Sequence, residues 1–256
     1  HVGNLGLAYS GLGEVGRAIE YYEAALEIAR EIGDRRGEGN RLGNLGNAYR
    51  GLGEVGRAIE YYEAALEIAR EIGDRRGEGN HVGNLGLAYS GLGEVGRAIE
   101  YYEAALEIAR EIGDRRGEGA DLGNLGNAYS GLGEVGRAIE YYEAALEIAR
   151  EIGDRRGEGA DLGNLGNAYR GLGEVGRAIE YYEAALEIAR EIGDRRGEAL
   201  HCWNLGLLHA ENDPARAAEL MQPLVAYERE IGHPDAEPDA ARVEKVRARI
   251  TADGQD

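Results

Sequence analysis

The chain has 256 residues and a formal net charge of −19 at pH 7, with 48 acidic side chains against 29 lysines and arginines. A surface this acidic repels phosphate backbones, which argues against nucleic acid as a partner. The sequence has no apolar run long enough to span a bilayer, and its single cysteine, Cys202, excludes an internal disulfide framework and fits a reducing, cytoplasmic location.

The dominant feature of the sequence is a repeat of forty residues. The segment HVGNLGLAYSGLGEVGRAIEYYEAALEIAREIGDRRGEGN at residues 1–40 recurs four more times with few changes. Such self-similarity is typical of a solenoid, in which each unit buries its apolar face only against its neighbours. Because the chain begins inside a repeat, we expect it to be the C-terminal part of a longer protein. The near-identical repeats are residues 1–40, 41–80, 81–120, 121–160 and 161–200.

The first of two predicted helices in each repeat is unusually rich in glycine. In its first complete copy it covers roughly 36–51 and holds five glycines, each of which costs about 1 kcal/mol relative to alanine in a helix interior. Packing of Leu42, Leu45, Ala48 and Tyr49 must therefore hold this segment. The glycines are expected to permit close helix approach, and GLGEVG supplies the turn that follows.

The second predicted helix covers residues 14–32 of the first repeat, because apolar residues recur there at helical spacing. This stripe consists of Ala18, Tyr22, Ala25, Ala29 and Ile32. Gly33 follows as a C-terminal stop, and Asp34 is placed to cap the next helix. No segment alternates with period two, so strands are not expected.

The C-terminal segment departs from the repeat. Residues 201–232 form a degenerate sixth repeat that keeps Leu205 and Gly206 in register, and Cys202 has the phase of a core residue. Residues 233–256 comprise a connector, a capping helix over 239–250 and a tail, because the last unit of a solenoid needs a cover. Trp203 either packs into this end or closes off the end of a groove.

These features together resemble the tetratricopeptide repeat family. Its pattern W-x2-L-G-x2-Y followed by A-x3-F is matched by Leu45, Gly46, Tyr49, Ala58 and Tyr62, with tyrosine in place of phenylalanine. The helix-ending proline of the family is absent, which lengthens the second helix and the period. The longer form is similar to repeats of Pins/LGN-type adaptors, kinesin light chains and bacterial signalling proteins. The resemblance covers residues 1–232 and implies an all-α, right-handed α-solenoid of antiparallel helix pairs.

A candidate binding face emerges from the places where the repeats differ. Numbering each repeat from 1 to 40, the varying positions 40, 7 and 10 share one arc of the first helix, and the resemblance implies that this arc lines the concave groove. Position 2 varies between valine and leucine and is expected in the core, whereas position 1 is expected at the rim of the arc. Position 4 is asparagine in every repeat.

Similar repeats use such asparagines to clamp a peptide backbone and arginines to bind acidic side chains. The alternative is that position-4 asparagines bond neighbouring helix backbone and that position 7 has merely drifted. The candidate peptide-binding residues are Asn44, Asn47, Arg50, Asn84, Asn124, Asn127, Asn164, Asn167 and Arg170.

The sequence offers no catalytic, cofactor or metal site. GLGEVG matches G-x-G-x-x-G, but here the motif joins two predicted helices, whereas the dinucleotide fingerprint needs a preceding strand. His1, His81 and His201 lie in different repeats, which is not a metal-ligand spacing. The carboxylates recur as a solvated helix surface, so we do not expect an enzyme.

The leading hypothesis is a non-catalytic protein-interaction scaffold that binds an extended peptide or protein segment in its concave groove, as the adaptor or sensor arm of a larger signalling protein. One alternative is end-to-end self-association through identical units. Others are a regulatory region of a nucleotide-dependent signalling ATPase encoded upstream and a consensus-engineered scaffold.

Overall fold

Paired helices joined by short turns make up the chain in a computed structural model that describes residues 2–253. No strand occurs among those residues. The chain divides into two units, the first ending at Leu132 and the second beginning at Gly133. The first unit contains α1 (Val2–Gly11), α2 (Val15–Glu31), α3 (Arg35–Gly51), α4 (Val55–Glu71), α5 (Arg75–Gly91), α6 (Val95–Ile112) and α7 (Arg115–Gly131). The second contains α8 (Val135–Ile152), α9 (Arg155–Gly171), α10 (Val175–Glu191), α11 (Arg195–His209), α12 (Pro214–Ile231) and α13 (Ala236–Asp253).

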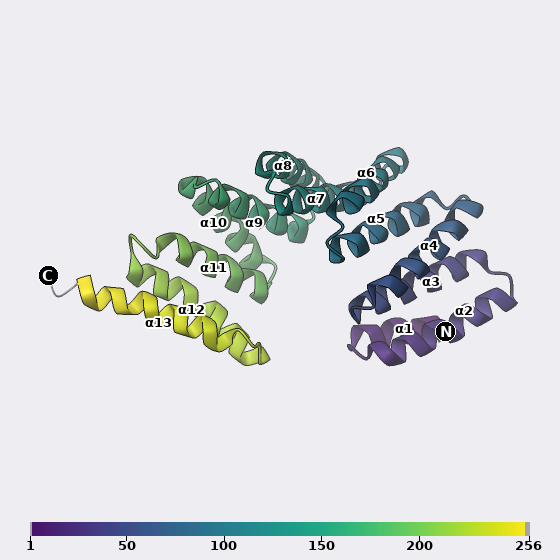
Figure 1. Ribbon diagram of the computed structural model, residues 1–256, viewed down its shortest axis with the longest axis horizontal. Coiled ribbons are helices and arrows are strands. Elements are labelled where there is room, and N and C mark those ends of the chain that lie inside the picture. Colours follow the sequence, from purple (N-terminus) through teal and green to yellow (C-terminus); the bar gives the residue numbers. More distant parts are fainter. Residues whose placement is uncertain (1, 254–256) are drawn as a thin grey trace. The chain divides into compact units, whose positions relative to one another are not determined.

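Within each unit every helix packs against the helices before and after it in the chain (Figure 1). We call α1, α3, α5, α7, α9 and α11 the first helices of the repeats, and α2, α4, α6, α8, α10 and α12 the second helices. This sequential packing of antiparallel pairs confirms the predicted all-α solenoid. None of the helices within residues 2–253 is long and apolar enough to cross a membrane.

The helix boundaries follow from local chemistry. The Asp34 carboxylate accepts a hydrogen bond of 2.9 Å from the Gly37 backbone N–H, which caps α3 as expected. Gly33 adopts a positive φ of 70° after α2, a conformation that glycine tolerates best. One detail of the prediction is wrong: Ile32 is 71% exposed and lies outside the core, just beyond the end of α2 at Glu31.

Two of the glycine positions in the first helices permit close helix packing. A Cβ added at Gly46 would lie 2.5 Å from Cε1 of the fully buried Tyr62, and one at Gly39 would lie 3.3 Å from Cγ2 of Ile68. By contrast, Gly51 has nothing within 4 Å of such a Cβ. Close approach therefore accounts for the sixth and thirty-ninth repeat positions but not for the eleventh. The four residues predicted to hold α3 are all buried, namely Leu42, Leu45, Ala48 and Tyr49.

The lengthened second helix leads into an ion network between repeats. Glu78 is largely buried and accepts hydrogen bonds from Arg70 (2.8 Å) and Arg75 (2.5 Å), while Arg75 also pairs with Glu111 of the next repeat. Burial alone would raise the pKa of Glu78, but the hydrogen bonds from the two arginines outweigh it and lower that pKa. Acidic residues in the linker thus fix the register of neighbouring repeats.

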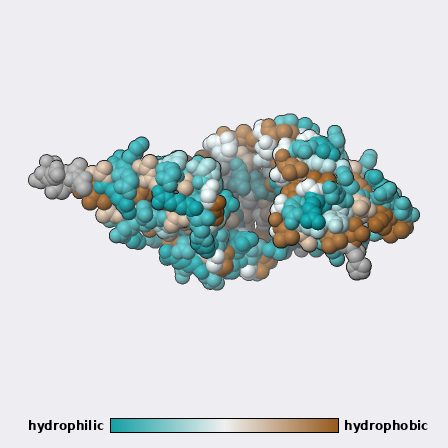
Figure 2. Space-filling view, turned by 90° about the horizontal axis from the view of Figure 1, so that it is seen from below, coloured by the Kyte–Doolittle hydropathy of each residue, from teal (hydrophilic) through white to brown (hydrophobic). Residues whose placement is uncertain are grey.

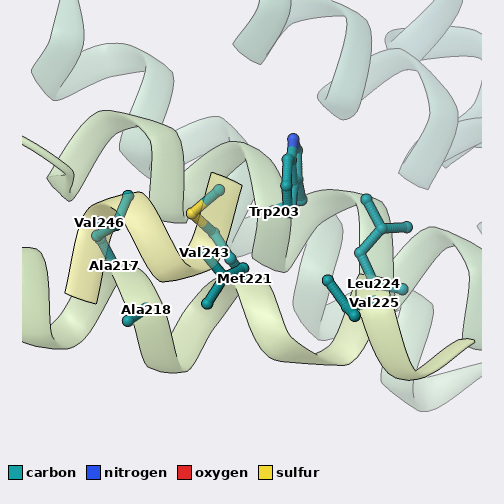
Figure 3. Close-up of a cluster of buried hydrophobic side chains, with 9 residues drawn as sticks. Trp203, Ala217, Ala218, Met221, Leu224, Val225, Val243 and Val246 are labelled. Carbon is teal, nitrogen blue, oxygen red and sulfur yellow. The ribbon is translucent and has the colours of Figure 1, made fainter. Parts of the chain in front are cut away.

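The last helix, α13, covers the C-terminal end of the second unit. Val243 and Val246 of α13 pack with Met221 and Leu224 of α12 and with Trp203 of α11 (Figure 3). Trp203 therefore packs into the end. The helix begins at Ala236, three residues before the predicted start, since the proline that follows lies in its first turn, where proline is tolerated. Cys202 is buried as predicted, and burial raises the pKa of its thiol.

The first repeat exposes apolar residues that the other repeats bury. Leu5 is 45% exposed, whereas its counterparts Leu45 and Leu85 are fully buried. Ile28 is likewise exposed, whereas its counterpart Ile68 is buried. Figure 2 shows apolar residues gathered at this end of the molecule, on the right.

Candidate peptide-binding face

Three cavities lie at equivalent places in the repeats. Each is bordered by two successive first helices and floored by the second helix between them. They measure about 150 Å³ between α1, α2 and α3, about 180 Å³ between α5, α6 and α7, and about 400 Å³ between α9, α10 and α11. We name them the Arg41, Asp121 and His201 cavities after the residue that each has at repeat position 1.

The variable positions and the invariant asparagine meet at these cavities. In the Asp121 cavity, Asn84 and Leu87 of α5 face Ala120 and Asn124 of α7. The His201 cavity has the same plan, with Asn164 and Asn167 of α9 and Leu200 and Asn204 of α11. Positions 40, 4 and 7 therefore share one face of the first helices, which we call the ladder face. Position 10 lies one turn farther along the same helices.

The position-4 asparagines have amide groups available for a ligand. Four of them are half-buried at the ladder face, and their side chains form no hydrogen bond to another group within residues 2–253. They are Asn44, Asn84, Asn124 and Asn164. The alternative, that these asparagine side chains bond the backbone of a neighbouring helix, is therefore not seen among the described residues. Asn204 differs, because its Oδ1 accepts a hydrogen bond of 3.1 Å from Arg170.

The position-7 asparagines have a structural partner. The Tyr62 hydroxyl donates to Oδ1 of Asn47 at 2.8 Å, and the Tyr182 hydroxyl donates to Oδ1 of Asn167 at 2.7 Å. These asparagines are exposed, so their NH₂ groups remain accessible while their oxygens fix the tyrosines. Arg50 is exposed beside the Tyr62 hydroxyl. Asn127 is exposed at the same repeat position.

We expected position 1 at the rim of the arc, but His81, Asp121 and Asp161 are buried there, and Arg41 and His201 are half-buried. Asp121 is only 9% exposed, and His81 and Asp161 are buried similarly. The glycine at position 3 of the preceding repeat makes this possible: a Cβ on Gly43 would lie 2.7 Å from Cε1 of His81. A sequence signal for this burial exists, because titratable residues alternate at position 1 while position 3 is glycine in all five near-identical repeats. The helical phase within one repeat could not show that the next repeat covers it.

Burial perturbs the titration of these residues. Burial, with a smaller contribution from the charge of Asp114, raises the pKa of Asp121 to about 7. Burial likewise raises the pKa of Asp161 to about 7. Burial lowers the pKa of His81 and His201, whose Nδ1 atoms are buried without a hydrogen-bond partner in the described residues. Uncharged histidines and an uncompensated carboxyl group thus occupy the same position in different repeats.

The fold and this face define an α-solenoid of helix-pair repeats. A model of the tetratricopeptide repeat matches residues 1–71, 78–151 and 159–222, and a second model of that repeat matches residues 44–111. The chain therefore belongs to the tetratricopeptide repeat family. Among curated proteins, none matches this sequence.

Solved structures share the fold at low sequence identity. BtubC (BKLC) from P. vanneervenii matches with a TM-score of 0.69 and 23% identity over 93% of this chain and 92% of that one. A signal transduction ATPase with numerous domains and a tetratricopeptide repeat sensor, from Pyrococcus horikoshii, matches with a TM-score of 0.80 and 22% identity. The match covers 95% of this chain and 37% of the ATPase. A Rap protein complexed with competence and sporulation factor matches with a TM-score of 0.69 and 18% identity. The match covers 96% of this chain and 74% of the Rap protein.

Proposed function

We propose that this chain is a non-catalytic interaction scaffold whose ladder face binds an extended peptide or protein segment. The observation that carries the proposal is the Asp121 cavity, which is flanked by two position-4 amides, Asn84 and Asn124, that form no side-chain hydrogen bond among the described residues. Each amide offers both a donor and an acceptor, which is what the backbone of an extended peptide needs. The Rap structure, which contains a bound factor, supports a peptide as the occupant.

The location of the sequence differences supports the same conclusion. Repeats differ at exposed ladder-face positions such as Asn80 and Ala120, whereas the second helices keep one sequence through all five repeats. An invariant frame with a varying exposed face is the arrangement expected of a recognition surface. The likeness to the repeat sensor of a signalling ATPase supports a role as the adaptor or sensor arm of a larger, cytoplasmic signalling protein.

The test is capture of peptides from a phage-displayed library of random dodecapeptides. Replacing both Asn84 and Asn124 by alanine should weaken the affinity for the selected peptides at least tenfold, since two uncharged hydrogen-bonding groups are lost. Helix content and unfolding midpoint should stay unchanged, because neither amide has a hydrogen-bond partner in the part of the chain that the structure describes. The matched control is Glu103→Ala on the exposed side of α6. Unchanged capture by the double variant would contradict the proposed face.

A second candidate function is self-association through the end of the first unit. The exposed Leu5 and Ile28 there have buried counterparts in other repeats, so this face has the chemistry of an interface between repeats. Because α13 covers the other end of the chain, two copies would join through their α1–α2 faces. Sedimentation velocity tests this: the mass should rise with concentration in the wild type and stay monomeric in Leu5→Glu. A concentration-independent monomer in both would exclude it.

A further inference from the structure

Each of the three cavities has a different ionisable residue at repeat position 1. The guanidinium of Arg41 borders the first, the carboxyl of Asp121 the second and the imidazole of His201 the third. The other walls share glycines, alanines and isoleucines, and the Asp121 and His201 cavities also have position-4 asparagines. Position 1 is therefore where the chemistry of the cavities differs most.

Asp121 is a buried carboxyl without a counter-charge. It lines its cavity, is 9% exposed, and has no hydrogen-bond or ion-pair partner among the described residues. The ionisable groups around it are Asp114 at the start of α7, Arg76 on α5 and Tyr102 on α6. Arg76 is exposed at the rim, with its Nε 4.0 Å from Oδ2 of Asp114. Arg76 pairs with Asp114 and not with Asp121, which leaves the Asp121 charge uncompensated.

Small residues keep the carboxyl accessible from the cavity. A Cβ built on Gly83 would lie 3.4 Å from Oδ1 of Asp121, which is ordinary van der Waals contact, so only a side chain larger than a methyl group would crowd the carboxyl. Gly79, Ala105 and Ala120 form further walls. The space of about 180 Å³ exceeds the roughly 30 Å³ that one water occupies in the liquid. The cavity therefore has room for the end of a long side chain.

We propose that the residue at repeat position 1 selects the side chain that each cavity accepts, and that the Asp121 cavity accepts a lysine or arginine of the bound peptide. This inference rests on the proposed function and names a specificity element of the same face. A buried carboxylate gains most from a cation that reaches it with a direct hydrogen bond, because the low dielectric that penalises the lone charge strengthens the pair. The net charge of the chain, −19, attracts such basic segments at long range.

The His201 cavity provides an internal contrast. Its imidazole lies against Gly163, where a Cβ would be 2.7 Å from Cε1, and burial lowers its pKa, so the ring is uncharged at neutral pH. Arg156 and Asp194 border the cavity with opposite charges, and Leu200 and Ile188 add apolar surface. This cavity has no net charge and about 400 Å³ of space. It accepts an uncharged, largely apolar side chain.

The experiment exchanges position-1 residues between the two cavities and repeats the selection of random dodecapeptides. The variants are Asp121→His and His201→Asp, each of which introduces a residue found naturally at that repeat position. Peptides selected on the wild type should be enriched in lysine or arginine at one site. Asp121→His should abolish that enrichment, and His201→Asp should create a second enriched site. For one selected basic peptide, Asp121→Asn should weaken binding about tenfold to a hundredfold.

A second measurement does not depend on peptide capture. The carboxyl carbon of Asp121, observed by NMR, reports its titration in the presence of n-butylammonium or, as the uncharged control, n-butanol. The ammonium should lower the pKa of Asp121 from about 7, while the alcohol should leave it in place.

The outcomes separate the two proposals. Peptides that bind tightly without basic enrichment, and bind Asp121→Asn equally well, would overturn the role of Asp121 while the proposed function stands. If no peptide is captured but n-butylammonium shifts the Asp121 titration, the cation site stands and the proposed function fails. An ammonium with no more effect than the alcohol would overturn the cation site.

Discussion

The sixth repeat position is the tightest packing point between the paired helices. Gly46→Ala would place a methyl group 2.5 Å from Cε1 and 2.6 Å from Cδ1 of Tyr62. Contacts this short require the ring to move by nearly 1 Å, given ordinary carbon contacts of roughly 3.5 Å. The ring has little freedom to move, because Tyr62 is fully buried and its hydroxyl donates to Asn47 at 2.8 Å.

Two opposing effects determine the magnitude. Replacing glycine by alanine in an unstrained helix stabilises a protein by about 0.4–1 kcal/mol. Forcing an extra methyl into a filled core destabilises it by roughly 1–3 kcal/mol. We expect the second effect to win at Gly46, with a net loss of about 1–2 kcal/mol. Gly56 in α4 is the matched control, since a Cβ there meets nothing within 4 Å, and Gly56→Ala should stabilise by about 0.5 kcal/mol.

The assay is urea unfolding followed by circular dichroism, combined with native-state hydrogen exchange of α3 and α4. Exchange is needed because repeat arrays can unfold in parts, so a single midpoint does not always report one transition. The two variants should move in opposite directions, with the loss at Gly46→Ala concentrated in α3 and α4. If both variants stabilise the protein to the same degree, the packing role assigned to these glycines is wrong.

Three further predictions concern titration, capping and the C-terminal end. Asp121→Asn should be more stable than the wild type at pH 8, by on the order of 2–4 kcal/mol, and no more stable at pH 4. The reason is that protonated Asp121 stabilises the fold, and that contribution is lost as pH rises through its folded pKa of about 7. Urea unfolding at both pH values checks this. Asp74→Ala should cost about 1 kcal/mol and Asp74→Asn much less, since the side chain accepts from the Gly77 N–H at 3.0 Å; equal losses would exclude capping as the cause. Val243→Asp should abolish exchange protection in α11–α13 before α8–α10, because it buries an unpaired carboxylate in the end cluster.

Much of the fold could be predicted because its determinants lie within one repeat. The spacing of Leu42, Leu45 and Tyr49 gives the buried face of α3, and Asp34 marks its start. The repeat itself then implies sequential packing. Ile32 shows the limit of this reasoning, since it continues the periodic pattern of α2 and is nevertheless exposed.

The candidate site could be predicted only in part. Positions 4, 7 and 40 meet at the cavities because they share one face of a single helix. Two features of the site could not be predicted from the sequence, because they depend on contacts between helices. The oxygen of Asn47 is occupied by a tyrosine of the paired helix, and Asp121 is buried by the preceding repeat through Gly83. Neither contact has a signature within one helix.

The most direct test of peptide binding on the ladder face observes the side-chain amides of the asparagines by NMR during titration with a selected peptide. The NH₂ signals of Asn84 and Asn124 should shift and saturate together with the measured affinity. The amide of Asn212, in the turn before α12, is the control and should not move. Saturable binding that leaves both ladder-face amides unmoved would contradict the account.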